Sequence, residues 1–311
     1  MRSSRHIRKS MGIVLILAGI MTAGVQTVFA AEEAKPAAEG AAPTAAAAEE
    51  KPTGDFTIGA MSQYIWRGYE MSRNSVVVQP SMTIAYKGFS VNLWGNMDTQ
   101  PYSSGTSGYS NTWNETDFTL SYTKTLGLFT VGGGYIYYAL GSLNKDAPKR
   151  ADSQEIFASV GLNTFLSPTF TVYKEIDRYK QWYFLLGVSH LIEFNPTVSL
   201  KLAATASYLL STYADAALFN AGAGYGGYPK FDSNSAATND KFSNFHDGTL
   251  SASLPIKVTG QITLTPTLSW IFPLTDDAKY EMKGQGLKGT ASASDRDSSY
   301  VVGGLTASFS F

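Results

Sequence analysis

Residues 300–311 read YVVGGLTASFSF, and the chain ends on Phe311. Successive side chains of a strand point to opposite faces, so this stretch has one apolar face and one of small or polar residues. The apolar face carries Val301, Leu305, Ala307, Phe309 and Phe311, and the other carries Tyr300, Gly304, Thr306, Ser308 and Ser310. Such alternation suits a strand between lipid and a wet lumen. A half-buried strand of a soluble protein would look the same, so the rest of the chain has to decide.

The same pattern recurs from Asp55 onward in segments of about ten residues, separated by connections that are short and long in turn. The strands expected are 56–67, 76–87, 89–98, 115–125, 128–140, 154–164, 169–178, 182–192, 197–209, 248–258, 261–272 and 299–311. Short Gly or Pro turns are expected in the periplasm, and longer connections, the longest at 210–247, outside. The sequence therefore predicts an all-β fold, a transmembrane antiparallel β-barrel of about twelve strands, with ten or fourteen as alternatives.

The first 30 residues have the pattern of a signal peptide. Four basic residues (Arg2, Arg5, Arg8 and Lys9) precede an apolar run over 11–25, and small residues at alternate positions lead to predicted cleavage after Ala30. Without those four, 20 basic side chains remain against 25 acidic ones, a net charge of −5. This balance does not favour nucleic-acid binding. The expected location is the outer membrane of a Gram-negative bacterium.

Residues 31–53 are rich in Ala, Glu and Pro. Such a segment has too little apolar surface to form a core, so we expect a periplasmic linker between the signal peptide and a barrel over 54–311. A contact with peptidoglycan or a periplasmic partner is the alternative.

Aromatic residues near the strand ends are typical of membrane interfaces. They include Tyr64, Trp66, Trp94, Trp113, Tyr135, Tyr137, Tyr138, Trp182, Tyr183, Tyr208 and Trp270. The alternative, core aromatics of a soluble β-sandwich, fits the signal peptide and the regular strands less well.

The polar faces of the strands supply the residues expected to line a lumen. These pore-lining candidates are Gln63, Arg67, Glu115, Asp117, Glu155, Glu175, Asp177 and Lys201. In strand 169–178 the assignment leaves Lys174 facing lipid, which costs about 2–4 kcal/mol at the bilayer midplane and less near its edge. We therefore expect Lys174 to mark a bulge or a register shift.

Catalysis, metals and cofactors are not expected. His190 and His246 are the histidines beyond residue 30, and Ser189 and His190 point to opposite faces of one strand, which is poor geometry for a nucleophile and its base. The chain has no cysteine, which removes disulfides and thiolate ligands. The acidic residues of 273–298 lack the spacing of a calcium loop.

The connection 210–247 contains the stretch AGAGYGGYP over 221–229. Loops longer than about 12–15 residues are usually functional or disordered. One interpretation is that this loop folds into the barrel as a constriction, with Tyr225 and Tyr228 as its contact residues; the other is that it stays outside.

Three stretches resemble the TorF family of outer-membrane porins: SQYIWRG over 62–68, VQPS over 78–81 and KGFSVNLWGN over 87–96. The middle hairpin, from Ser167 to His190, is also similar, and the resemblance covers about 54–200. Lys174 and Glu175 depart from the Tyr-Asp expected there. The resemblance implies a channel with no assigned substrate. In such proteins an assembly machinery reads a C-terminal aromatic signal, here Phe309 and Phe311.

We therefore expect a channel that lets small hydrophilic solutes diffuse passively across the outer membrane, with lipids, the assembly machinery and those solutes as partners. About eight strands leave a filled interior and about sixteen an open one, so twelve predicts a narrow channel. The alternative is a non-transporting surface barrel, an adhesin or structural protein, that uses its outer loops.

Overall fold

The structure is a computed structural model that describes residues 51–72, 75–99, 112–140, 152–178, 180–212, 227–285 and 296–311. The predicted signal peptide, almost all of the predicted linker, and Tyr225 lie outside these residues.

Seventeen strands and one helix are assigned within the described residues. Their bounds are β1 Thr53–Met61, β2 Ile65–Trp66, β3 Tyr69–Glu70, β4 Val77–Tyr86, β5 Phe89–Asp98, β6 Thr112–Leu126, β7 Phe129–Leu140, β8 Ser153–Leu162, β9 Thr169–Glu175, β10 Gln181–Glu193, β11 Ser199–Ser211, β12 Pro229–Phe231, β13 Ala237–Lys241, β14 Ser243–Ser253, β15 Ile256–Lys257, β16 Ile262–Pro273, α1 Asp276–Gln285 and β17 Tyr300–Ser310.

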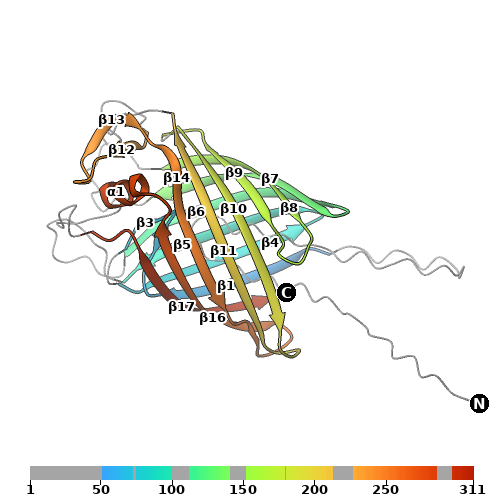
Figure 1. The fold of residues 1–311 in the computed structure, drawn as a ribbon. Coiled ribbons are helices and arrows are strands. Elements are labelled where there is room, and N and C mark those ends of the chain that lie inside the picture. Colours follow the sequence, from blue (N-terminus) through green and yellow to red (C-terminus); the bar gives the residue numbers. More distant parts are fainter. Residues whose placement is uncertain are drawn as a thin grey trace, which may run out of the picture.

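Twelve of these strands form a closed antiparallel wall (Figure 1). The wall strands follow one another around the ring in the order β1, β4, β5, β6, β7, β8, β9, β10, β11, β14, β16 and β17. β14 pairs with β16, and β17 pairs with β1, so no edge is left open. The predicted all-β fold and the twelve-strand barrel are confirmed.

The two ends of the barrel differ, and we call them the turn end and the loop end. The turn end holds the short connections and the ends of β1 and β17 that lie near residues 53 and 310. Lys87 and Gly88 make one such turn, with φ angles of 50° and 82°, the combination that a two-residue type I′ hairpin requires. The loop end holds the long connections together with α1, β12 and β13 (Figure 1).

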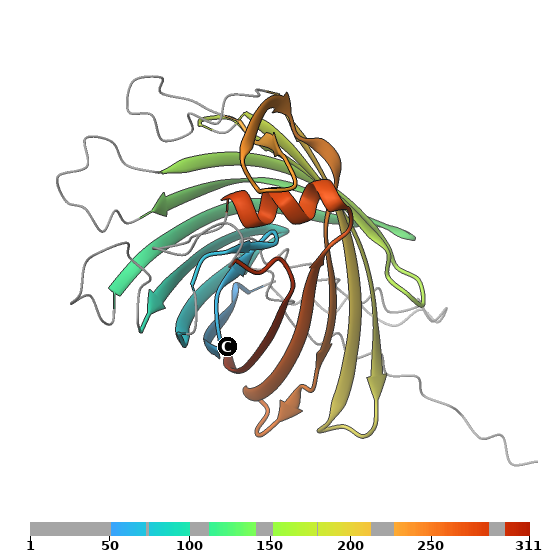
Figure 2. The ribbon, with the colours of Figure 1, turned by 60° about the vertical axis from the view of Figure 1, so that its left-hand side comes forward.

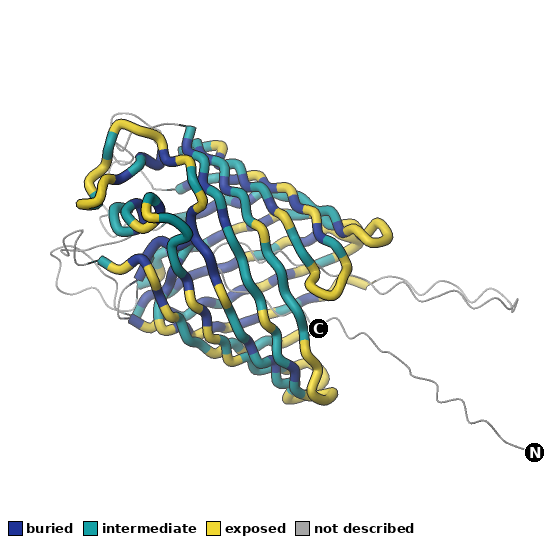
Figure 3. Tube along the Cα trace, viewed as in Figure 1, coloured by how far each residue is buried: buried dark blue, intermediate teal, exposed yellow. Residues whose placement is uncertain are grey.

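Buried and exposed residues alternate along the wall strands (Figure 3). Side chains that point away from the lumen are apolar and exposed, as a surface in contact with lipid requires. They include Phe56, Ile58, Met82, Ile84, Val91, Leu93, Phe118, Leu120, Leu305 and Phe309. The opposite faces carry mainly Ser, Thr, Gly and carboxylate residues, with buried aromatic residues among them. The barrel is therefore of the transmembrane, outer-membrane type. Within the described residues no helix is long and apolar enough to cross a membrane.

Two predicted strands differ from the observed ones by five residues or more at one end, and smaller shifts occur at other strand ends. The first was expected over 56–67, but β1 covers Thr53–Met61, and residues 65–70 form a separate hairpin, β2–β3, which turns at Arg67 and Gly68 where both φ angles are positive. The tenth was expected over 248–258 but β14 covers Ser243–Ser253. There a register irregularity opposite Ala206 and Tyr208 interrupts the alternation on which sequence reasoning depends.

Several predicted interface aromatics in fact point inward. Tyr64, Trp94, Tyr138 and Tyr183 are buried, and Trp66 packs against the buried core. Trp113 and Trp270 do face outward and are about half exposed. The difference arises because the interior near the loop end is filled by a chain segment, and aromatic rings pack around it.

The predicted irregularity at Lys174 is absent, because β9 keeps a continuous register with both β8 and β10. Lys174 faces outward one residue before the loop end of β9, and its Nζ lies 4.9 Å from the ring centroid of Trp182. A lysine at a strand end can reach the interface, so the cost of facing lipid is small there.

Candidate functional site: the filled mouth of the barrel

The β2–β3 hairpin lies inside the ring of wall strands at the loop end, beneath α1 (Figure 2). Its turn is formed by Arg67 and Gly68, with φ angles of 48° and 80°. Gly suits such an angle, whereas Arg pays about 1 kcal/mol or more for it.

The Arg67 side chain crosses the interior to Glu155 on β8. Its two terminal nitrogens donate to the two carboxylate oxygens at 2.8 and 2.7 Å, a bidentate pair. Tyr138 on β7 donates its hydroxyl to the same carboxylate at 2.9 Å. Arg67 is 8% exposed and Glu155 1%. Burial makes both charges costly, and the paired geometry offsets that cost.

Three aromatic rings surround the guanidinium of Arg67. Its Cζ lies 4.6 Å from the ring centroid of Trp66, 4.8 Å from that of Tyr173 and 4.3 Å from that of Tyr183. Guanidinium groups are attracted to aromatic faces at such distances. Trp66 belongs to the hairpin, whereas Tyr173 on β9 and Tyr183 on β10 belong to the wall, so these contacts dock the hairpin on the wall.

Tyr64 anchors the approach to the hairpin. Its hydroxyl donates to Glu115 on β6 at 2.8 Å, and its ring packs against Trp94 at 5.7 Å. Burial and the charge of Glu115 raise the pKa of Tyr64 well above its usual value of 10. The hydroxyl therefore stays protonated and keeps donating. Asp117, two residues further along β6, is buried with its Oδ1 free of any hydrogen bond.

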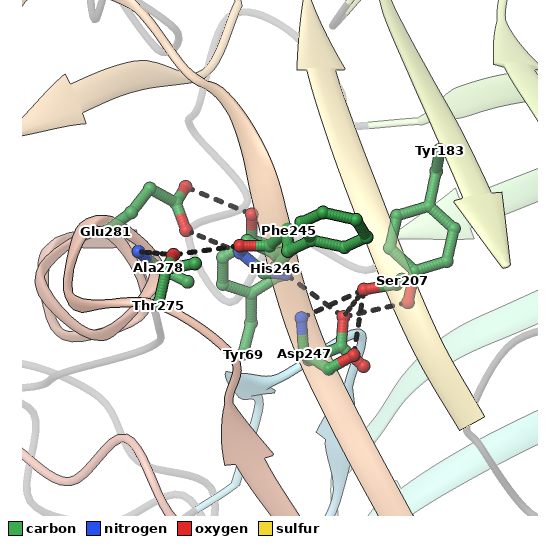
Figure 4. A network of polar contacts seen from close by, with 9 residues as sticks. All are labelled: Tyr69, Tyr183, Ser207, Phe245, His246, Asp247, Thr275, Ala278 and Glu281. Carbon is green, nitrogen blue, oxygen red and sulfur yellow. Dashed lines mark hydrogen bonds and ion pairs between the residues drawn. The ribbon is translucent and has the colours of Figure 1, made fainter. Parts of the chain in front are cut away.

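The other side of the hairpin joins a polar network under α1 (Figure 4). Tyr69 donates to Glu281 of α1 at 3.0 Å, and His246 of β14 contacts Glu281 at 2.9 Å and Asp247 at 3.0 Å. Burial and the nearby carboxylates, chiefly Glu281, raise the pKa of Tyr69 well above 10. Tyr228 stacks on Tyr69 with 5.7 Å between the ring centroids. The hairpin is thus held from the wall and from above.

The sequence around α1 explains its position. Thr275 caps the helix by accepting a hydrogen bond from the Ala278 amide at 3.2 Å, and the first turn carries Asp276 and Asp277. Acidic residues and a hydroxyl cap suit a helix N-terminus. Ala278, Glu281 and Met282 are the buried residues, three and four apart, so one face of the helix covers the hairpin.

The structure places the predicted pore-lining residues in different settings. Glu115, Asp117, Glu155, Glu175 and Lys201 lie on inward faces of wall strands. Glu175 accepts hydrogen bonds from Ser153 and from three backbone amides of the β9–β10 connection, so it organises that connection.

Three other predicted pore-lining residues lie outside the wall strands. Asp177 follows β9 rather than lying in it. Gln63 follows β1 and lines a cavity of about 30 Å³ beside the hairpin, room for about one water. Arg67 is inward, as predicted, but at the tip of a hairpin and not at a strand end.

Sequence reasoning missed the hairpin itself. It looked for a constriction at 210–247, whereas the interior is occupied by residues 65–70 of the first connection. Tyr228 is buried above that hairpin, and its role in a constriction stays a prediction; Tyr225 lies outside the described residues. Gly68 was the available signal, since a two-residue hairpin turn needs positive φ angles and Gly adopts them readily.

In the parts of the chain that the structure describes, no group of three or more His, Asp or Glu side chains is arranged to hold a metal ion.

Comparisons with known proteins give the following. No protein-family model matches the chain, so the resemblance to the TorF family stays a prediction, and no curated protein matches it either. Among solved structures, the NanC porin is 12% identical, with 82% of this chain and 98% of that chain covered and a TM-score of 0.45. OmpF of Salmonella typhi, solved in complex with daunomycin, is 7% identical, with 84% and 97% covered and a TM-score of 0.35.

The outer-membrane channel DcaP of Acinetobacter baumannii is also similar, with 12% identity, 84% and 96% covered and a TM-score of 0.29. The barrel fold of this chain rests on its closed strand pairing and not on these likenesses. What the fold and its apolar outer surface define is an outer-membrane β-barrel whose mouth holds a docked hairpin.

Proposed function

We propose that the chain is a narrow outer-membrane channel for passive diffusion of small hydrophilic solutes, made after removal of a signal peptide over residues 1–30. The observation that carries the proposal is a closed twelve-strand wall with a polar interior, at whose loop end the β2–β3 hairpin forms a sheet separate from the wall. The hairpin pairs only with itself, so it can leave the lumen without opening the wall.

The polar interior supports passage better than a purely structural barrel does. Below the hairpin the inward residues are mostly Ser, Thr and Gly, small side chains that leave room for water. A structural barrel would be expected to fill a lumen of this width with large packed side chains. With short turns in the periplasm, the loop end and its hairpin face the outside.

Planar-bilayer recording of the full mature chain tests the proposal. We expect discrete ion-conducting steps, smaller than those of sixteen-stranded porins, and liposomes that swell in small sugars but not in large ones. A barrel that inserts and shows the heat-modifiable mobility of a folded barrel, yet never conducts, would contradict channel function.

A non-transporting surface protein is the second candidate. The observation in its favour is that α1 and the β12–β13 hairpin form an ordered cap at the loop end, joined by the ion pair of Lys230 and Asp277 at 3.1 Å. Failure to conduct, together with specific binding to a partner through this cap, would favour it.

A further inference from the structure

The wall of the barrel contains a cation cage that is independent of the hairpin. Glu155 supplies a carboxylate, Tyr138 fixes that carboxylate by a hydrogen bond, and Tyr173 and Tyr183 supply two ring faces. These four residues come from the neighbouring strands β7, β8, β9 and β10. The four cage residues therefore belong to the wall and not to the hairpin that carries Arg67.

The occupant in this structure is the guanidinium of Arg67. It meets the carboxylate with two nitrogens and lies over both tyrosine rings. Proteins generally bind guanidinium groups in this way, by a bidentate pair with a carboxylate and by stacking on aromatic faces. Arg67 therefore contacts the cage as a bound guanidinium ligand would, although it belongs to the same chain.

The surroundings also favour a cation. Among the described residues, the buried side chains that can carry a charge are eight carboxyl groups against Arg67 and His246. The carboxylates are Glu70, Asp98, Glu115, Asp117, Glu155, Glu175, Asp247 and Glu281. An interior with such an excess of acidic groups attracts cationic solutes and repels anionic ones.

We propose that the cage of Tyr138, Glu155, Tyr173 and Tyr183 is a binding subsite for the guanidinium or ammonium group of a small cationic solute. Arg67 is the internal ligand that fills this subsite, and a solute takes it by displacing Arg67 and with it the tip of the hairpin. As a step in permeation, the inference rests on the proposed channel function; as a binding site, it can be tested without conductance.

Competition with Arg67 sets the affinity of the intact protein. A tethered group acts at an effective concentration in the millimolar range or above, so a free solute binds the intact protein more weakly than it binds the empty cage. Removing Arg67 should therefore reveal the site, because nothing then competes for it.

The experiment uses the Arg67→Ala variant of the mature full chain in detergent, titrated calorimetrically with guanidinium chloride in the low millimolar range. Urea, the neutral analogue of the same shape, and sodium chloride at equal ionic strength are the controls. The Arg67→Ala/Glu155→Gln variant keeps the empty volume but lacks the carboxylate. If Arg67→Ala does not fold, a chain with residues 65–70 replaced by Asn-Gly empties the same cage, because Tyr64 and Met71 are already joined by a backbone hydrogen bond of 2.9 Å.

We expect guanidinium to bind Arg67→Ala about tenfold more tightly than it binds either the intact protein or the double variant. Urea and sodium should show no such difference. Equal heats with sodium, or guanidinium binding that survives Glu155→Gln, would overturn the cage. Guanidinium binding without any bilayer conductance would refute the channel function but not the cage. Conductance without guanidinium binding would refute the cage but not the channel function.

Discussion

A buried ion pair between Arg67 and Glu155 holds the tip of the hairpin, and Glu155→Gln tests how strongly. The variant keeps the size of the side chain but leaves the guanidinium of Arg67, which is 8% exposed, without a negative partner. Breaking a buried pair in this way costs about 3 kcal/mol or more, because the remaining charge is left uncompensated. At about 1.4 kcal/mol per factor of ten, the ratio of undocked to docked hairpin should rise about a hundredfold.

Hydrogen exchange at the hairpin gives this ratio directly. The Met71 and Ser72 amides bond to the Tyr64 carbonyl at 2.9 and 3.1 Å. A two-stranded hairpin as short as this one is not stable on its own, so these bonds break and the two amides exchange when the hairpin undocks from the wall. We expect their exchange to accelerate about a hundredfold in Glu155→Gln, with wall amides unchanged. Glu193→Gln, at the exposed turn end of β10, is the matched control. Equal protection of these two amides in both variants would refute the account of the hairpin as docked by Arg67.

Three further predictions concern the hairpin and the C-terminal residue of the barrel. Gly68→Ala should lower the free energy of hairpin docking by about 1–3 kcal/mol, because the φ of Gly68 is +80° and a Cβ would lie 2.6 Å from a buried methyl group. Gly127→Ala is the control: its φ is also positive but the space around it is open, so hairpin exchange should stay unchanged. Deleting Phe311 removes two backbone hydrogen bonds to β1 and the predicted assembly signal, so the heat-modifiable fraction in the membrane should fall; an unchanged fraction would argue against that signal. Burial and nearby carboxylates raise the pKa of Tyr64 and Tyr69, so the contribution of their hydroxyl groups to docking is fully present below pH 10 and should be lost as the pH rises above it. A Tyr64→Phe/Tyr69→Phe variant should lack this loss in exchange measurements.

The wall of the barrel could be predicted from the sequence because one physical rule governs all of it. A strand between lipid and a polar lumen has to alternate, and residues 300–311 show that rule as clearly as the structure does. Inward positions such as Glu115, Glu155 and Lys201 followed from the same parity. Bounds failed where the chain left the rule, at Met61 and at the irregular start of β14.

The contents of the barrel could not be predicted in the same way. The β2–β3 hairpin has only two residues in each strand, too short for any alternation to be visible. The contact of Arg67 with Glu155 joins residues 88 positions apart, and no local pattern predicts such a pairing. A Tyr or Trp at a strand end suits lipid headgroups and an occupied lumen equally well, so the sequence alone does not distinguish the two settings. Tyr64 and Tyr183 were assigned to the interface but lie in the occupied lumen.

The central claim is that a docked hairpin narrows a hydrophilic channel. The most direct test is the single-channel conductance of the intact barrel beside that of the chain in which residues 65–70 are replaced by Asn-Gly. The account predicts that both conduct, and that the replaced chain conducts severalfold more, with the wall intact by circular dichroism and heat-modifiable mobility. Equal conductance in the two chains, or none in either, would contradict it.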